Sequence, residues 1–495
     1  MGQNGKSRYS GGLSNTNERV IGVPERPSLN QWLSLQVRYP DRIGMLGKVT
    51  SAIGQAGADI RGIDFVSASG GVVTRDFAIT VKDREHGERV VQALRRVRGV
   101  SVVHAVDRAL ALHSRGKIQI TPRVPLNTQQ DLLIFYTPGV ARVSEAIHAR
   151  RARVFDLTIK SNAVAIVSDG SAVLGLGDIG PHAALPVMEG KSMLFREFGG
   201  VDAFPLCIVA HGAQDIIAFC KAIAPTFGGI NLEDIAAPVC FEVQDRLRAG
   251  LQIPVFHDDQ DGTAAVVLAA LTNAVKVVGK DLRSLKTVIA GAGAAGTACA
   301  RILLSAGVRD IIVCDRAGAI YAGRKEHMTE AKERLAAQTN PRGFRGPLAK
   351  ALVGADFFLG VSGPNIVSGA ALRKMARKPI VFALANPIPE VDPEEGLRHA
   401  AVFATGRSDY PNQINNVLIF PGLFRGLLDC RARQVNASIV RAAARALARV
   451  LKPSELRPDY IVPSVFDRRV APAVARAAAQ AAIAAGLAKA HLPRG

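Results

Sequence analysis

The chain has 495 residues, of which 48% are hydrophobic and only 5% are aromatic. This length allows two to four domains with aliphatic cores, and the composition favours helices packed on parallel sheets over an all-β sandwich. The formal net charge is +20, but Lys and Arg are spread along the chain without a long basic run, so we expect no nucleic-acid partner. The sequence holds no run of about 18 uncharged apolar residues and predicts no membrane span.

The N-terminal segment and the cysteines bear on where the protein works. Residues 1–29 are rich in Gly, Ser, Asn and Arg and lack an apolar core, which predicts a disordered tail rather than a signal peptide. None of the six cysteines forms a C-x-x-C pair or shows zinc-type spacing. We therefore expect reduced thiols and a cytoplasmic location.

The first folded unit is predicted over residues 30–112. Apolar and polar residues alternate over 33–39, as in a half-buried strand. The spacing of Leu46, Val49 and Ile53 places them on one helical face, and Gly57 is positioned to end that helix. Two strands, a second helix and a last strand are predicted near residues 60–68, 73–81, 90–97 and 100–106. The resulting order βαββαβ predicts a ferredoxin-like domain.

A linker is expected over residues 113–130, and the pattern changes after it. Short apolar strands end in loops rich in Gly, Asp and Asn, and they alternate with alanine-rich helices. This alternation predicts an α/β fold built on parallel sheets, with functional loops at the strand ends.

A glycine motif predicts a dinucleotide site. Residues 285–290 form an apolar strand, and 298–306 are expected to be a helix that ends near Gly307. The turn between them reads Gly291, Ala292, Gly293, Ala294, Ala295 and Gly296, a G-x-G-x-x-G motif that lets a pyrophosphate reach the helix N-terminus.

Asp315 ends the next strand, where a carboxylate accepts the ribose hydroxyls and repels a 2′-phosphate. NAD is therefore preferred as cofactor, although the neighbouring Arg316 leaves NADP open. The alternative is that Asp315 is only a cap or turn residue.

Two pairs of carboxylates follow two other strands. Glu233 and Asp234 come after a glycine turn, and Asp258 and Asp259 follow an apolar strand before a long apolar helix. Four carboxylates at two strand ends repel one another unless a cation neutralises them, and hard oxygen ligands favour Mg²⁺ or Mn²⁺. The alternative is a set of caps and turns on two loops.

Several motifs, in order and spacing, resemble those of malic enzymes from about residue 112 to the C-terminus. They are Tyr136-Thr137-Pro138-Gly139-Val140-Ala141, Ser168-Asp169-Gly170, Leu174-Gly175-Leu176-Gly177-Asp178-Ile179-Gly180, Met188-Glu189-Gly190-Lys191, Phe256-His257-Asp258-Asp259-Gln260, Ala383-Leu384-Ala385-Asn386-Pro387, and 405–416 with its Asn415-Asn416 pair. The first unit resembles ACT domains, through Pro40-Asp41-Arg42-Ile43-Gly44 and Gly57-Ala58-Asp59-Ile60.

The resemblance implies roles for individual residues. Glu233, Asp234 and Asp259 would be the metal ligands. Lys191 resembles the general base, made neutral by burial and cationic neighbours, and Tyr136 the general acid, with Asp258 beside Lys191 to tune it. Asn386, Asn415 and Asn416 would hold the substrate. The chain departs from many bacterial members at Asp261, where they carry His, and this is expected to add negative charge near the metal.

The implied function is the oxidative decarboxylation of (S)-malate to pyruvate and CO₂ with reduction of NAD(P)⁺. The domains would be an ACT-like regulatory domain over 30–112, a substrate and metal domain over 113–275, a Rossmann domain over 276–425 and C-terminal helices over 426–495. An amino-acid effector and a homodimer or homotetramer are expected. The alternatives are a malolactic enzyme on the same scaffold, a non-catalytic amino-acid-sensing regulator and an amino-acid dehydrogenase.

Overall fold

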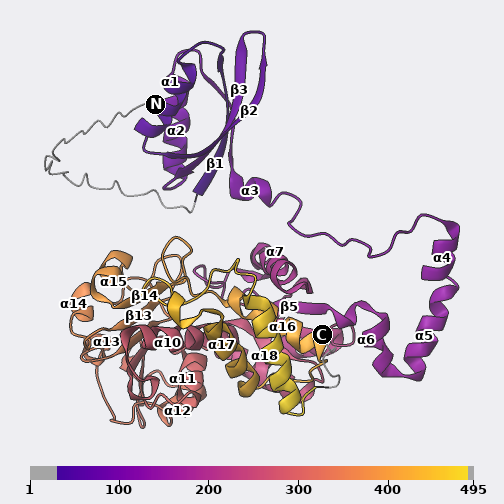
Figure 1. Ribbon diagram of the computed structural model, residues 1–495, viewed down its shortest axis with the longest axis vertical. Helices are drawn as coiled ribbons and strands as arrows, with labels where there is room; N and C mark the ends of the chain where they lie inside the picture. The colour runs from indigo at the N-terminus through magenta and orange to yellow at the C-terminus, as the bar shows by residue number, and fades with distance from the viewer. Residues whose placement is uncertain (1–30, 489–495) are drawn as a thin grey trace, which may run out of the picture. The chain divides into compact units, whose positions relative to one another are not determined.

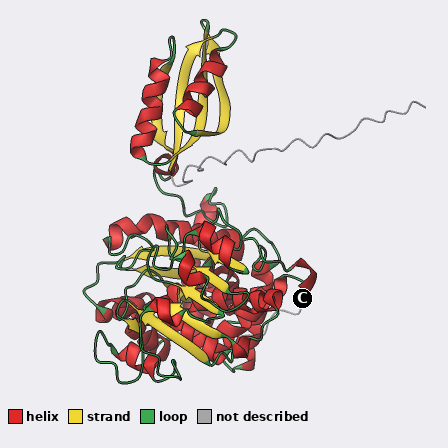
Figure 2. Ribbon diagram, turned by 90° about the vertical axis from the view of Figure 1, so that its left-hand side faces the viewer, coloured by secondary structure: helices red, strands yellow, loops and turns green. Residues whose placement is uncertain are grey.

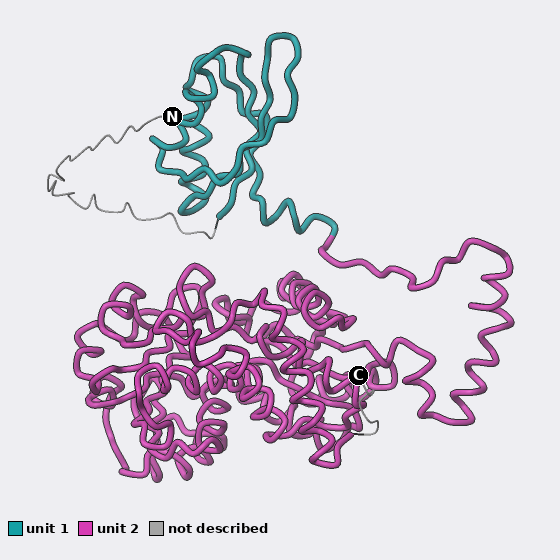
Figure 3. The backbone as a smooth tube through the Cα atoms, viewed as in Figure 1, with its two compact units in different colours: residues 1–115 teal, residues 116–495 magenta. Residues whose placement is uncertain are grey.

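The computed structural model describes residues 31–488 (Figure 1). The chain forms two compact units, residues 1–115 and 116–495, which Figure 3 shows in different colours. The predicted disordered tail, residues 1–29, lies outside the described residues.

Unit 1 is a four-stranded antiparallel sheet with two helices on one face (Figure 2). The strand order β2-β3-β1-β4, together with the chain order βαββαβ, confirms the predicted ferredoxin-like domain. Val49 and Ile53 are buried against the sheet as predicted, with Met45 rather than Leu46 completing the buried face of the first helix. The elements are β1 (Gln31–Pro40), α1 (Met45–Gln55), β2 (Asp59–Ser69), β3 (Val72–Val81), α2 (Arg84–Arg96), β4 (Ser101–Asp107) and α3 (Arg108–Leu112).

Unit 2 begins with short helices and a parallel sheet of order β6-β5-β7-β8. The strands β5, β7 and β8 are buried throughout, as expected for a parallel sheet covered on both faces. The elements are α4 (Gln129–Phe135), α5 (Gly139–Ala149), η1 (Arg151–Arg153), α6 (Val154–Leu157), η2 (Ile159–Ser161), β5 (Ala163–Ser168), α7 (Gly180–Gly199), β6 (Asp202–Cys207), α8 (Ala213–Ile223), β7 (Gly229–Leu232), α9 (Val239–Gly250), β8 (Val255–His257) and the π turn η3 (Asp258–Gly262).

A second sheet of order β11-β10-β9-β12-β13-β14 carries the glycine motif. Its strands are parallel except for β11, which pairs antiparallel at the edge. The elements are α10 (Thr263–Val278), η4 (Leu282–Ser284), β9 (Lys286–Ala290), α11 (Ala294–Ser305), β10 (Asp310–Asp315), β11 (Gly318–Ala319), α12 (Glu330–Ala336), α13 (Leu348–Ala351), β12 (Phe357–Gly360), α14 (Gly369–Leu372), β13 (Ile380–Ala383), α15 (Pro393–His399) and β14 (Val402–Thr405).

The long helix α10 joins the two sheets into one core. Twelve of its sixteen residues are buried, and one hydrophobic cluster contains side chains from both sheets, from α10 and from the C-terminal helices. The expected domain boundaries at 275 and 425 fall inside α10 and α16, where this shared core leaves no natural division. The C-terminal elements are η5 (Asn416–Leu418), α16 (Phe420–Asp429), α17 (Ala437–Val450), η6 (Pro453–Glu455) and α18 (Val470–Ala484).

Residues 258–278 are long and apolar enough to cross a membrane by length and composition alone. However, 72% of an 18-residue apolar window in this segment is buried inside the protein, which is the pattern of a core helix.

Candidate active site

Three carboxylates meet where β7 and β8 end. The two strands are parallel neighbours, so their carboxyl ends lie at the same edge of the sheet. Glu233 and Asp234 follow β7, Asp259 follows β8, and one carboxylate oxygen from each lies within 4.8 Å of the others. The backbone N–H of Asp234 donates to Asp259 Oδ2 at 3.0 Å, which fixes one loop against the other. The spacing predicted that carboxylates after these two strands would lie close together, and the choice of these three as ligands follows from the family resemblance.

The cluster has the electrostatics of a cation site. Burial and the neighbouring charge of Asp259 together raise the pKa of Asp234 to about 7. Burial also raises the pKa of Glu233 well above its ordinary value, despite the neighbouring Lys191. Asp258 Oδ1 and Asn231 Oδ1 are buried without a hydrogen-bond partner. A crowded, desolvated set of hard oxygen atoms fits a small divalent cation such as Mg²⁺ or Mn²⁺.

Lys191 lies beside the carboxylates, on the inner face of α7. Its ammonium group contacts Glu233 and donates to Asp258 Oδ2 at 2.5 Å, with all three side chains buried. Burial alone lowers the pKa of Lys191, but the charges of Asp258, Glu233 and Asp259 outweigh burial and hold it above the ordinary value. The expectation of cationic neighbours around Lys191 is therefore wrong, because the charged groups in contact with it are anions.

The three predicted substrate asparagines are placed differently. Asn416 donates its side-chain amide to Asp258 and to Thr263 Oγ1, so it orients Asp258. Asn415 Oδ1 accepts the backbone N–H of Val417 and caps η5, and the residue also lines a cavity.

The third, Asn386, lies in the loop after β13 and packs closely on two glycines. A Cβ added at Gly175 would lie 2.6 Å from the Asn386 carbonyl oxygen, and one at Gly406 would lie 2.6 Å from its amide nitrogen.

Asp261 does not add free negative charge to the metal site. Its Oδ2 accepts from Arg248 Nη2 at 2.5 Å and from Gln244 Nε2 at 2.6 Å, both on α9. Arg248 therefore balances the charge of Asp261, which corrects the expectation from sequence. A cationic partner on a different helix could not be read from local spacing.

The glycine motif adopts the predicted strand–turn–helix geometry. Gly291 has φ of 118°, and a Cβ there would lie 2.4 Å from the Val361 carbonyl oxygen. A Cβ on Gly296 would collide with the backbone of Gly291, whereas Gly293 faces open space. Helix α11 begins at Ala294, inside the motif rather than at the expected residue 298. A cavity of about 1400 Å³ opens beside this turn and reaches Asp315, which suits a dinucleotide.

Two cations hold Asp315 at the rim of that cavity. Its Oδ2 accepts from Arg324 Nη2 and from Lys332 Nζ, both at 2.6 Å, and its Oδ1 caps the turn at Ala317. Burial by itself raises the pKa of Asp315, but these hydrogen bonds lower it below the ordinary value. The carboxylate is thus ionised and oriented, and Arg324 and Lys332 are partners that the sequence did not reveal.

Tyr136 is the predicted site residue that the described chain does not bring to the cluster. It follows α4, 68% of it is exposed, and no residue of α4 or α5 is buried. In Figure 1 these two helices stand away from the rest of unit 2.

Glu390 is a buried carboxylate that the sequence analysis missed. It accepts the backbone N–H of Ser362 at 2.7 Å and that of Ala385 at 3.0 Å. Ser362 lines the dinucleotide cavity, and Ala385 precedes Asn386. One side chain therefore ties the loop after β12 to the loop after β13. No local motif distinguishes it from an acidic residue on a surface loop.

Glu390→Gln is expected to raise the KM for NAD and to lower kcat by about tenfold, because the amide nitrogen cannot accept one of the two N–H groups. The measurement is steady-state kinetics with NAD varied, and Glu394→Gln on the exposed first turn of α15 is the matched control. A lower melting temperature with unchanged kinetics would show that Glu390 stabilises the fold without positioning the loops.

The chain matches three protein families. Residues 115–215 match the family described as "Malic enzyme, N-terminal domain", residues 260–483 match "Malic enzyme, NAD binding domain", and residues 30–104 match "ACT domain". The first two matches cover β5, β6 and the second sheet, and the acidic cluster lies in residues 216–259 between them.

Among curated proteins, the chain is 51% identical to the "NAD-dependent malic enzyme" of Geobacillus stearothermophilus, across 95% of this chain and 98% of that protein. It is 50% identical to the "Bifunctional malic/malolactic enzyme" of Bacillus subtilis, across 77% and 94%. Among solved structures, malic enzyme from Pyrococcus horikoshii is 46% identical with a TM-score of 0.75, across 78% of this chain and 92% of that one.

Proposed function

Because this chain belongs to the malic enzyme family, we propose that Lys191, Tyr136 and the carboxylates at the ends of β7 and β8 perform its reaction. The enzyme oxidises and decarboxylates malate to pyruvate and CO₂ and reduces NAD. One observation carries the assignment of residues. Lys191 Nζ lies in contact with Glu233 and Asp258 at the edge of the sheet where three potential metal ligands converge.

Glu233, Asp234 and Asp259 would hold the divalent cation, which supplies Lewis-acid polarisation of the substrate's C2 oxygen. Once their charges are neutralised, less negative charge keeps the proton on Lys191, and its pKa falls. Lys191 then takes the proton from the C2 hydroxyl of malate as general base. Asp258, held by Asn416, orients the amine through its hydrogen bond.

The glycine turn at Gly291 would hold NAD, which when bound supplies the acceptor for the C2 hydride. Asn386 and Asn415 are proposed to hold the substrate's carboxylates, so that the C4 carboxylate departs as CO₂ once C2 has become a carbonyl. Tyr136 is proposed to deliver the proton to C3 that completes pyruvate. Lys191, Glu233 and Asp258 are buried, so water is excluded from the surroundings of the lysine amine.

The test is an assay of the purified chain with malate, NAD and either Mg²⁺ or Mn²⁺. We expect net NADH and pyruvate in equal amounts, loss of activity with EDTA, and recovery when the cation is restored. NADP should support slower turnover, because ionised Asp315 repels a 2′-phosphate. Lactate without net NADH would indicate the malolactic reaction, the second candidate, which the name of the Bacillus subtilis relative favours.

Unit 1 is an ACT domain, a class that can bind small-molecule effectors. We propose an amino acid as its ligand and a homodimer or homotetramer as the assembly. The free cysteines of the described chain fit the predicted cytoplasmic location.

A further inference from the structure

The loop between β5 and α7 begins with polar residues that the proposed reaction does not use. Residues 169–179, here named the β5–α7 loop, start with Asp169-Gly170-Ser171, and both polar side chains are half-buried. Asp169 Oδ1 accepts two hydrogen bonds from Ser171, one from its backbone N–H at 3.0 Å and one from its hydroxyl at 2.6 Å. Because an ionised carboxylate can only accept, the hydroxyl proton points to Asp169 and the oxygen is left to accept from elsewhere.

This hydroxyl oxygen holds the loop after β7, which carries two of the proposed metal ligands. The backbone N–H of Ala236 donates to Ser171 Oγ at 2.9 Å. The next residue of the β5–α7 loop, Ala172, donates its backbone N–H to the carbonyl oxygen of Asp234, also at 2.9 Å. Two successive residues therefore fix the backbone of the ligand loop at Asp234 and two residues beyond it.

Asp234 needs this support because its backbone conformation is unfavourable. Its φ is 52°, in the left-handed region that residues other than glycine rarely adopt. Such a conformation persists only where surrounding contacts hold it. A return to ordinary φ would swing the side chain out of its present direction. The carboxylate lies within 4.8 Å of those of Glu233 and Asp259 only while the loop stays in this conformation.

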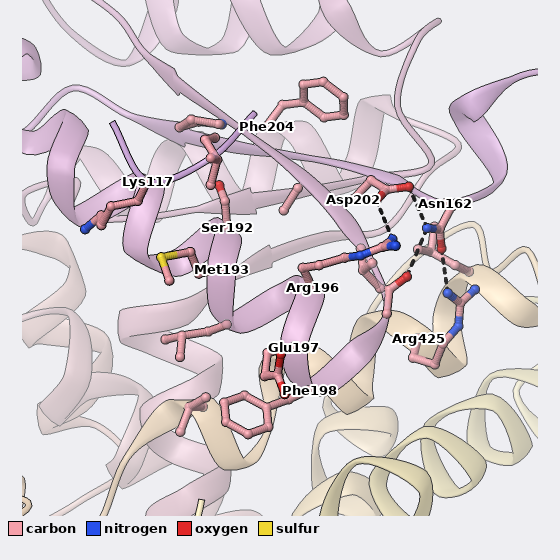
Figure 4. A pocket seen from close by; sticks show the side chains of 18 of the residues that line it. Lys117, Asn162, Ser192, Met193, Arg196, Glu197, Phe198, Asp202, Phe204 and Arg425 are labelled. Carbon is pink, nitrogen blue, oxygen red and sulfur yellow. Dashed lines mark hydrogen bonds and ion pairs between the residues drawn. The ribbon is translucent and has the colours of Figure 1, made fainter. Parts of the chain in front are cut away.

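The β5–α7 loop also joins the ligand loop to the helix that carries Lys191. The carbonyl oxygen of Gly170 accepts the backbone N–H of Gly180, the first residue of α7, at 3.2 Å. The contact is close, since a Cβ on Gly170 would lie 2.3 Å from the Gly180 carbonyl oxygen. The other end of α7 is fixed separately by the Arg196–Asp202 ion pair at 2.7 Å, which Figure 4 shows. The serine hydroxyl thus lies at the junction between the helix of the base and a metal ligand.

We propose that Ser171, oriented by Asp169, is a positioning residue that holds Asp234 in its metal-binding conformation. The proposal rests on the proposed role of Asp234 as a metal ligand. Without the hydroxyl, Ala236 loses its acceptor and the loop occupies the binding conformation for a smaller fraction of the time. The apparent Kd for the cation then rises in inverse proportion to that fraction. A saturating cation restores the conformation, so the chemical step itself is unchanged.

Ser171→Ala is expected to raise the Kd for Mn²⁺ about tenfold, measured by isothermal titration of the purified enzyme. The Mn²⁺ concentration that gives half-maximal NADH formation should rise by the same factor. At saturating Mn²⁺, kcat should stay within about twofold of wild type, because only the population of the binding conformation has changed. This separation of metal affinity from kcat is a result that a purely structural role would not produce.

Two variants of Asp169 test the same hydrogen bonds without changing Ser171, which keeps the test open should Ser171→Ala fold poorly. Asp169→Ala should weaken Mn²⁺ binding as Ser171→Ala does. Asp169→Asn should bind Mn²⁺ within about twofold of wild type, because its amide oxygen still accepts from the Ser171 hydroxyl. Equal weakening in both Asp169 variants would show that the carboxylate acts through its charge, and it would overturn the proposal.

Ser368→Ala is the matched control. The Ser368 hydroxyl also accepts a backbone N–H, that of Ala371 at 3.4 Å, but it caps α14 on the second sheet, so Mn²⁺ affinity should not change. A lower melting temperature of metal-free Ser171→Ala with unchanged Mn²⁺ affinity would overturn the positioning role alone. So would a loss of kcat that saturating Mn²⁺ does not restore. Absence of Mn²⁺ binding by the wild-type enzyme would instead overturn the proposed metal site, and this inference with it.

Discussion

Lys191→Ala is expected to lower kcat for malate oxidation and for oxaloacetate decarboxylation together, by about 10³-fold each. The reason is that Lys191 is the only amine in contact with Glu233 and Asp258 among the described residues. Without it, no group in that position takes the C2 hydroxyl proton. The measurement is NADH formation from malate and, separately, loss of oxaloacetate followed by its absorbance.

Two controls separate chemistry from folding in this variant. Removing one member of a buried ion-pair cluster destabilises a protein by about 3–5 kcal/mol, so the melting temperature also falls in the metal-free state. Lys160→Met removes another buried lysine, which donates to the backbone of Ala224 and Phe227 away from the cluster. It should lower stability without lowering kcat. Added methylamine should partly rescue Lys191→Ala, and a variant with unchanged kcat would refute the assignment.

Asp259→Asn is expected to weaken Mn²⁺ binding and to lower metal-dependent activity by about 10³-fold, because one anionic ligand is lost from a set of three. Isothermal titration with Mn²⁺ measures the first effect and NADH formation the second. Asp261→Asn is the matched control, two residues along the same turn, since Arg248 already balances that charge. Equal Mn²⁺ affinity in wild type and Asp259→Asn would rule out this cation site.

The same site predicts how pH acts on the metal-free and metal-bound protein. Burial raises the pKa of Asp234 from 3.8 to about 7, so the folded state binds more protons than the unfolded state between these values. The contribution of Asp234 to the free energy of unfolding therefore falls as pH rises through this window. Mn²⁺ must displace the proton, so its affinity should fall as pH drops below about 7.

The local chemistry of this protein was readable from the sequence. The alternation over 33–39 predicted β1, and the strand–glycine–helix pattern predicted the turn at Gly291 with Asp315 at the end of β10. The pairs Glu233-Asp234 and Asp258-Asp259 were found as strand-end carboxylates because strand and loop signals are local. These features depend on residues close in the chain, where periodicity and turn chemistry carry the information.

Partners between distant segments could not be read in this way. Arg248 neutralises Asp261 from another helix, Arg324 and Lys332 orient Asp315, and Glu390 joins two loops. The anionic surroundings that raise the pKa of Lys191 depend on the packing of α7 against β5 and β6, which brings Lys191 to the carboxylates that follow β7 and β8. Local spacing gives no sign of which ionised groups will be neighbours after folding.

The sequence alone therefore determined the family resemblance and the ferredoxin-like fold of the first unit. It also identified the strand-end carboxylates, Lys191 and the glycine turn as the candidate site residues. Only the tertiary structure decided that three carboxylates converge, that Asn416 holds Asp258, and that Tyr136 is exposed at the end of α4, away from these carboxylates. The physical reason is that side-chain identity and periodicity can be read along the chain. The charges around a group, its burial and its distance from other groups are set only when distant segments pack together in the folded protein.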